Sequence, residues 1–117
     1  MNFDEFWGLL LTDLNHEKKF VTLSRENEFN AYSERNKNDE WVVRVITNNG
    51  ELRGQIPSNE FEGVWNNTKD RPLDKRFVNN DGKLESYITK SGSEGKTMNL
   101  SYITKLIHYV VNDQNMT

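Results

Sequence analysis

A strand–turn–strand pattern in the middle of the chain constrains the fold more than any other feature. Residues 41–47 read WVVRVIT, residues 48–50 read NNG and residues 51–56 read ELRGQI. A run rich in β-branched residues predicts a strand, and Asn-Gly is typical of a tight turn because both residues tolerate positive φ angles. The pattern therefore predicts an antiparallel β-hairpin over residues 41–56.

The length of this turn decides which side chains share a face of the hairpin. A two-residue turn at Asn49-Gly50 pairs Thr47 with Leu52, and it gathers on the buried face the side chains of Trp41, Val43, Val45, Leu52 and Ile56. Three polar residues then lie together on the other face, namely Arg44, Arg53 and Gln55. A three-residue loop breaks this pairing, so both registers stay open, and we favour the two-residue turn.

Helical periodicity marks three further segments. Near the N-terminus, Asn2 and Glu5 have the spacing of a capping box. Apolar residues at steps of three and four follow, and these are Phe3, Phe6, Trp7, Leu10 and Leu14. A short central helix is expected over residues 58–67, begun by Ser58 as N-cap. A C-terminal amphipathic helix, capped by Asn99 or Ser101, is predicted by Leu100, Ile103, Leu106, Ile107, Val110 and Val111.

The remaining strands complete an α+β chain. Residues 18–24 and 28–33 predict a strand pair, residues 34–40 a polar loop, and Asp81-Gly82 the turn of a second hairpin. We therefore expect one domain over residues 1–117, with an N-terminal helix, an antiparallel sheet of short hairpins, a short central helix and a C-terminal helix.

Composition excludes several chemistries. The chain has 117 residues, a net charge of -3 and no cysteine, so disulfides, thiolate metal sites and cysteine nucleophiles are absent. The N-terminus lacks the basic region of a signal peptide, and no apolar run approaches the ~20 residues of a membrane span. We expect a cytoplasmic protein with no membrane association.

A loop-like stretch reading GSEGKT, at residues 92–97, resembles part of a phosphate-binding loop. The complete motif needs a first glycine at position 90, where this chain has Lys90. The pentapeptide SYITK occurs on both sides of this stretch, at residues 86–90 and 101–105, and it is too short for a structural repeat. Neither feature predicts a nucleotide site or any other cofactor.

No residue pattern indicates catalysis. His16 and His108 have no further ligand at metal-binding spacing, and Asp81-Gly82 with Lys83 is far more typical of a turn than of a nuclease site. We therefore expect no enzyme, no metal, no cofactor and no small-molecule substrate.

Charge is distributed unevenly. Residues 64–112 hold eight basic and five acidic residues, which leaves the remainder of the chain strongly acidic. The asymmetry is compatible with one basic face, although a mixed, solvated surface is the more ordinary explanation.

One family resembles part of this chain. The run TNNGELRGQIPSNEFEGVW at residues 47–65, followed by Arg76-Phe77, resembles small winged-helix-like DNA-binding modules of bacterial restriction and defence proteins. The resemblance covers roughly residues 41–90. It implies that helix 58–67 and the hairpin at Asp81-Gly82 contact DNA, with bases read by Asn59, Asn66 and Asn67.

Two hypotheses about function follow. The first is a non-enzymatic module that contacts DNA in bacterial defence or gene control, with phosphates held by Lys69, Arg71, Arg76 and Lys83, and a second patch formed by Arg44, Arg53 and Gln55. The alternative is a small acidic inhibitor of the anti-defence or immunity type, which acts through a protein partner. Its surface would use Asp4, Glu5, Asp13, Glu17, Glu26, Glu28, Glu34, Asp39 and Glu40.

Overall fold

The computed structural model describes residues 1–23, 26–50, 52–70 and 99–116 of the chain. The elements along these residues are α1 (Phe3–Asp13), β1 (Lys18–Val21), β2 (Glu28–Arg35), β3 (Trp41–Thr47), β4 (Leu52–Pro57), α2 (Ser58–Thr68) and α3 (Leu100–Met116). The α+β class and the order of these helices and strands confirm the prediction. The hairpin expected at Asp81-Gly82, the first SYITK copy and the GSEGKT stretch lie outside the described residues.

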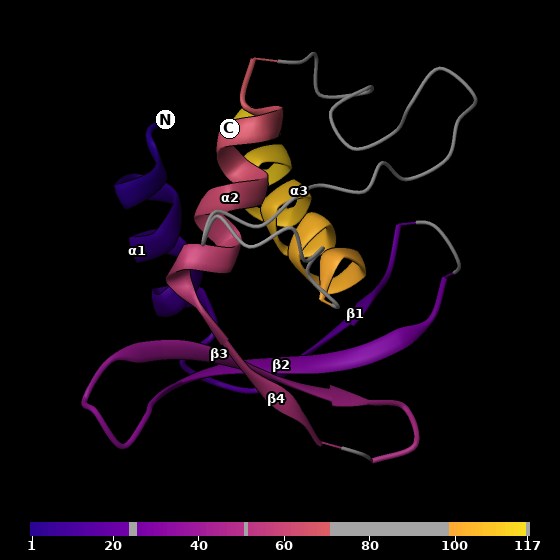
Figure 1. Ribbon diagram of the computed structural model, residues 1–117. Helices are drawn as coiled ribbons and strands as arrows, with labels where there is room; N and C mark the ends of the chain where they lie inside the picture. Colours follow the sequence, from indigo (N-terminus) through magenta and orange to yellow (C-terminus); the bar gives the residue numbers. More distant parts are fainter. Residues whose placement is uncertain (24–25, 51, 71–98, 117) are drawn as a thin grey trace.

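The four strands form an antiparallel meander in the order β1-β2-β3-β4, and the described helices all lie on one face of it (Figure 1). We call the face covered by helices the inner face and the opposite one the outer face. The register pairs Phe20 with Phe29, Ala31 with Val45, and Val43 with Ile56. Because side chains alternate along a strand, this register points all of these side chains to the inner face.

The core lies between the inner face and the helices. From the sheet it takes Phe20, Phe29, Ala31, Val43, Val45 and Ile56, and from the helices Phe6, Leu10, Leu14, Phe61, Val64, Trp65, Ile103, Leu106, Ile107 and Val110. Stacked rings join α1 to α2, since the centroids of Phe6 and Trp65 are 4.9 Å apart. On the other side, α3 packs on the sheet through Tyr102 against Phe29, at 5.0 Å.

The ends of α1 follow from its sequence. The Asn2 side chain accepts a hydrogen bond from the Glu5 amide at 2.8 Å, which confirms the predicted N-cap. At the other end, the Ser33 amide donates to the Leu14 carbonyl at 2.8 Å. The Ser33 hydroxyl donates to the carbonyls of Leu11 and Leu14, at 3.0 and 3.2 Å. These bonds fasten the C-terminal end of α1 to β2.

The β3–β4 turn differs from the predicted two-residue turn, and the strand register next to it differs as well. Gly50 donates to the Thr47 carbonyl at 2.8 Å and has φ 78°, whereas neither Asn48 nor Asn49 has a positive φ. The strands shift by one residue between Arg44 and Ile46, so that Leu52 pairs with Ile46 instead of Thr47. A β-bulge of this kind turns the following side chains to the opposite face. Leu52 is accordingly 58% exposed and was wrongly assigned to the core.

Two smaller corrections concern Trp41 and the start of α2, and the start of α3 decides between the two caps that were predicted. Trp41 is on the inner face by register but is 42% exposed, and the Arg35 guanidinium lies 4.9 Å from its ring centroid. The N-cap of α2 is Pro57, without a side-chain hydrogen bond, so the assignment of Ser58 was wrong. α3 begins at Leu100, which puts Asn99 rather than Ser101 at its cap position.

Candidate functional site

A groove of about 700 Å³ beside β1 is the candidate site in the described part of the molecule. It is lined by the whole of β1 (Lys18–Val21), by Glu28 at the start of β2, and by Lys105 and Tyr109 on α3. The two α3 residues are four positions apart, which places them on the same side of the helix. The groove is open to solvent and more apolar than polar, with Phe20 and Tyr109 in edge-to-face contact at 5.1 Å.

Among the described residues, one backbone edge of β1 has no paired strand, and this edge faces the groove. Within these residues β1 pairs only with β2, which puts it at one margin of the sheet (Figure 1). The Thr22 amide donates to the Asn27 carbonyl at 2.9 Å, which shows that Thr22 faces β2. Since backbone groups alternate in an antiparallel ladder, the N–H and C=O groups of Lys19 and Val21 point away from β2. Val21 is 40% exposed.

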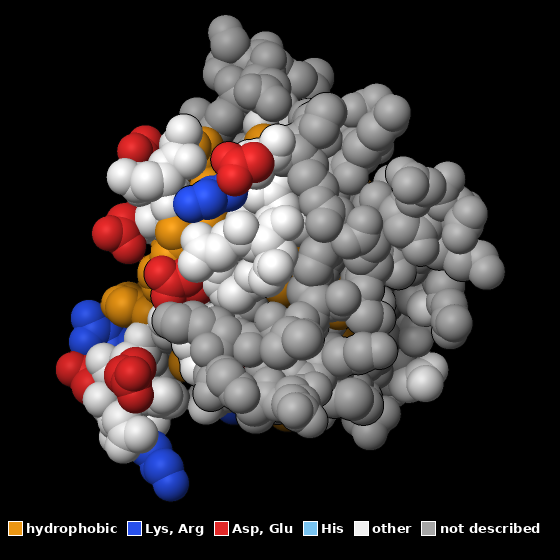
Figure 2. All heavy atoms as spheres, turned by 45° about the horizontal axis from the view of Figure 1, so that its top comes forward, with side chains coloured by type: hydrophobic (Ala, Val, Ile, Leu, Met, Phe, Trp, Pro, Cys, Tyr) orange, Lys and Arg blue, Asp and Glu red, His pale blue; other side chains and the backbone are white. Residues whose placement is uncertain are grey.

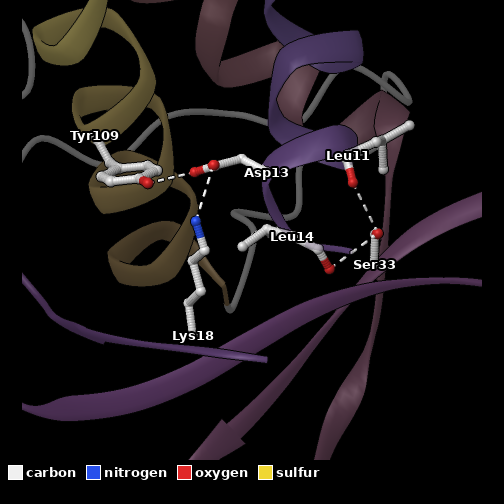
Figure 3. A network of polar contacts seen from close by, with 6 residues as sticks. All are labelled: Leu11, Asp13, Leu14, Lys18, Ser33 and Tyr109. Carbon is white, nitrogen blue, oxygen red and sulfur yellow. Dashed lines mark hydrogen bonds and ion pairs between the residues drawn. The ribbon is translucent and has the colours of Figure 1, made fainter. Parts of the chain in front are cut away.

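One wall of the groove is held by a polar junction of three elements (Figure 3). Tyr109 on α3 donates its hydroxyl proton to Asp13 Oδ2 at the end of α1, and Lys18 Nζ on β1 donates to Asp13 Oδ1 at 2.9 Å. Burial raises the pKa of Asp13, but the hydrogen bonds from Tyr109 and Lys18 outweigh it, so that the pKa lies below its ordinary value. The hydrogen bond to Asp13 in turn raises the pKa of Lys18. The carboxylate and the ammonium group are therefore both charged at neutral pH.

The other charges of the groove are more accessible. Lys19 and Glu28 form an ion pair at 3.1 Å in which both side chains are more than half exposed. Lys105 forms no ion pair with any described residue. Burial, followed by the charge of Lys105, lowers the pKa of His108, which is half-buried on α3. The lining therefore carries three lysines against one glutamate, in a chain whose net charge is -3.

The predicted patch on the outer face of the sheet is assembled in part. Arg44 Nε and Gln55 Nε2 both donate to Glu34 Oε1, at 2.8 and 2.9 Å, as neighbours on β3, β4 and β2. The hydrogen bond from Gln55, followed by that from Arg44, lowers the pKa of Glu34 despite its partial burial. The side chain of Arg53, the third member predicted, lies outside the described residues. Glu34 neutralises Arg44, so this pair adds no net positive charge.

The four predicted DNA-contacting residues on α2 and at its C-cap are all exposed, but one of them is hydrogen-bonded within the helix. Asn59, Asn66 and Lys69 are exposed, and so is Asn67, whose amide donates to the Gly63 carbonyl of its own helix at 2.8 Å. α2 also carries the acidic residues Glu60 and Glu62. On the face seen in Figure 2, the Lys and Arg side chains of the described residues are interspersed with Asp and Glu.

Three further residues of that prediction, Arg71, Arg76 and Lys83, lie outside the described residues. Most of the acidic residues proposed for an inhibitor surface have partners. Asp13, Glu28 and Asp39 form ion pairs with Lys18, Lys19 and Arg35, Glu17 accepts from Asn30, and Glu34 accepts from Arg44 and Gln55. Neither charge pattern expected from the sequence therefore stands out as a continuous, unpaired surface in the described part of the chain.

The described residues show neither a metal centre nor a membrane span. No group of three or more His, Asp or Glu side chains in the described ranges is arranged to hold a metal ion. No helix within those ranges combines the length and apolar character needed to cross a bilayer.

Sequence reasoning missed the groove beside β1. Lys105 and Tyr109 are more than 80 residues from Lys18, and only the packing of α3 on the sheet brings them together. The available signal was weak: two adjacent lysines opening a short strand, and a lysine and a tyrosine at helical spacing in the last helix.

Comparison of the chain with protein families, with curated proteins and with solved structures finds no match. The resemblance to winged-helix-like DNA-binding modules therefore stays a prediction.

Proposed function

We propose that this protein is a non-enzymatic, cytoplasmic binding module that acts through a protein partner, and that the partner docks in the groove beside β1. The observation that carries the proposal is the groove itself, with apolar side chains of Phe20 and Tyr109 along a strand edge that no other described strand pairs with. A hollow next to a strand edge offers main-chain hydrogen bonds and apolar contact together, which is how many domains bind peptide segments.

The polar groups of the groove support binding rather than a reaction. The Tyr109 hydroxyl and the Lys18 ammonium group are both engaged with Asp13, and Lys19 is paired with Glu28. An active site usually holds several polar groups that converge on one point of an enclosed pocket. Here the groove is open and its charges are spread along its rim.

DNA contact is the second candidate, and exposed Asn59, Asn66 and Lys69 on α2 favour it. A nucleic-acid surface draws its affinity from cations that are free to neutralise phosphates. Among the cations proposed for that surface whose side chains are described, Arg44 is held in an ion pair with Glu34, and Lys69 alone is exposed. For this reason we rank a protein partner above DNA. For either candidate, we propose that the protein acts in bacterial defence or gene control.

The proposal is tested by selecting ligands and mapping where they bind. A random peptide library displayed on phage is selected on the immobilised full chain, and selected peptides are titrated into the ¹⁵N-labelled protein while amide chemical shifts are followed. We expect saturable shifts centred on Lys18–Val21, Lys105 and Tyr109. Lys105→Glu is expected to weaken binding, whereas Lys37→Glu, the same change in the distant β2–β3 loop, is not. Peptides that bind elsewhere, or a selection that yields none, would overturn the proposal.

DNA is tested in parallel with the same proteins. Labelled duplex and single-stranded DNA are titrated at about 50 mM and about 200 mM salt, and fluorescence anisotropy is measured. Saturable binding that weakens steeply with salt, and that is lost in Lys69→Glu but kept in Lys37→Glu, would favour the second candidate. A flat trace for the wild type is the result that we expect.

A further inference from the structure

We propose, building on the proposed function, that the groove takes an extended acidic segment of the partner, which adds to β1 as a fifth, antiparallel strand. The edge of β1 that faces the groove decides the conformation of this segment. Lys19 and Val21 direct their N–H and C=O groups away from β2, and an extended chain alongside β1 is the arrangement that satisfies these groups in register. α3 lies beside the groove with Lys105 and Tyr109, so the added strand would run between β1 and this helix.

The alternation of side chains along the added strand follows from the same geometry. Phe20 points to the inner face and, with Tyr109, forms an apolar surface, so side chains of the segment on this side are expected to be apolar. Lys19 points to the outer face, where its pair with Glu28 is exposed and open to exchange. Side chains of the segment on that side are expected to be acidic. The preferred ligand therefore alternates apolar and acidic residues.

Charge also favours a foreign segment over a second copy of this chain. Pairing β1 with β1 of another molecule would bring two sets of Lys18, Lys19 and Lys105 to one edge, and lysines on edge strands are a common guard against such self-pairing. An acidic segment instead meets a groove that keeps one excess positive charge, from Lys105, after Lys18 is paired with Asp13 and Lys19 with Glu28. Lys105 has no ion-pair partner among the described residues and lies on α3 beside Tyr109, so it adds positive charge from the inner side of the groove, while Lys19 is the lysine that faces the acidic side chains.

A designed peptide tests both parts of the proposal. The probe is an acetylated and amidated octapeptide of alternating valine and aspartate, titrated into the ¹⁵N-labelled full chain. We expect shifts at the groove and slower hydrogen exchange of the Lys19 and Val21 amides, since these amides become hydrogen-bonded. The matched control, in which lysine replaces aspartate, is expected to bind at least about threefold more weakly, because it loses several surface charge contacts.

Backbone methylation separates strand addition from simple docking in the groove. Residues of the added strand that hydrogen-bond to Lys19 and Val21 lie directly opposite them and share their outer face, so they are the aspartates. N-methylation of two aspartates is expected to weaken binding about tenfold or more, whereas N-methylation of two valines leaves it within about threefold. Lys105→Glu is expected to weaken binding of the aspartate peptide about two- to fivefold, and Lys37→Glu is expected to leave this binding unchanged.

Several results would overturn the inference without touching the proposed function. Equal binding of the two methylated peptides would exclude antiparallel strand addition, while docking in the groove would stand. Equal or tighter binding of the lysine peptide would exclude the acidic partner. Dimerisation through β1, seen in sedimentation and abolished by Val21→Asp, would identify a second copy as the occupant. No binding at millimolar peptide also rejects the inference, and the proposed function then rests on the display selection alone.

Discussion

On the inner face of β2, Phe29 packs against Phe20 and Tyr102, whereas on the outer face of the same strand Glu34 accepts hydrogen bonds from Arg44 and Gln55. The inner contacts bury apolar surface. Each Å² removed from water stabilises the folded state by ~25 cal/mol, provided that the side chains pack closely. The outer contacts are charge-assisted hydrogen bonds at a half-buried surface, where solvent competes for each group. The inner face therefore supplies most of the stability, and the outer face has more freedom to change.

The largest expected effect tests this difference between the two faces on two residues of β2. Phe29→Ala removes a ring that is 1% exposed and leaves a cavity, so we expect the free energy of unfolding to fall by about 3–5 kcal/mol. Tyr32→Ala, on the outer face and half-buried, is expected to cost about 1 kcal/mol. Urea denaturation monitored by tryptophan fluorescence measures both. Equal losses would contradict the assignment of the two faces.

The two carboxylate junctions sharpen the comparison. Asp13 joins α1, β1 and α3 on the helical side, and Glu34 joins β2, β3 and β4 on the outer face. We expect Asp13→Asn to lower the free energy of unfolding by about 1–2 kcal/mol, kept small by solvent screening, and Glu34→Gln by about 0.5–1 kcal/mol. The larger value is expected because β2, β3 and β4 are already joined by backbone pairing, whereas Asp13 links two helices and a strand that have no such ladder between them.

A double-mutant cycle shows whether Tyr109 acts through Asp13. Asp13→Asn, Tyr109→Phe and the double variant are compared in the same urea experiment, and a coupling of about 0.5–1 kcal/mol is expected. Additive effects would mean that the tyrosine hydroxyl contributes nothing through this carboxylate.

The pH dependence of stability follows from the same two groups. The pKa values of Asp13 and Glu34 are lowered in the folded protein, so the unfolded chain binds protons more readily. Their contribution to the free energy of unfolding is complete when the pH is above the ordinary carboxyl pKa, near 4. It is lost as the pH falls through the lowered pKa values of the folded protein. Thermal melts between pH 7 and pH 3 should therefore decline less steeply for Asp13→Asn and for Glu34→Gln than for the wild type. Parallel curves would contradict the shifts.

The two faces of the sheet also show which features could be predicted from the sequence and which could not. Alternation in residues 41–47 correctly predicted that Val43 and Val45 are buried and that Arg44 lies with Gln55, because these are properties of one hairpin. Alternation did not identify Glu34 as the partner of Arg44, since this contact depends on the register between β2 and β3. Trp41 was wrongly expected in the core because alternation gives the face of a strand but not where the covering helices end.

The candidate site was less predictable than the fold. The groove is made by β1 and by α3, which are separated by most of the chain, and no local pattern links Lys18 to Tyr109. Charge counting drew attention to Lys69, Arg71 and Arg76 instead, since it registers where cations occur along the sequence and not which of them the fold brings together. Fold class follows from short-range periodicity, whereas this site follows from long-range packing.

The smallest expected effect decides between the two hairpin registers. With the β-bulge, Leu52 lies on the outer face opposite Ile46 and is 58% exposed, so Leu52→Thr should change the free energy of unfolding by less than about 0.5 kcal/mol. With the two-residue turn expected from Asn49-Gly50, Leu52 would be buried opposite Thr47, and the same change would cost about 2 kcal/mol or more. Ile56→Thr, buried in either register, is the control and should be strongly destabilising. A large loss for Leu52→Thr would place it on the inner face and would exclude the bulge, because one residue of register reverses every side chain that follows.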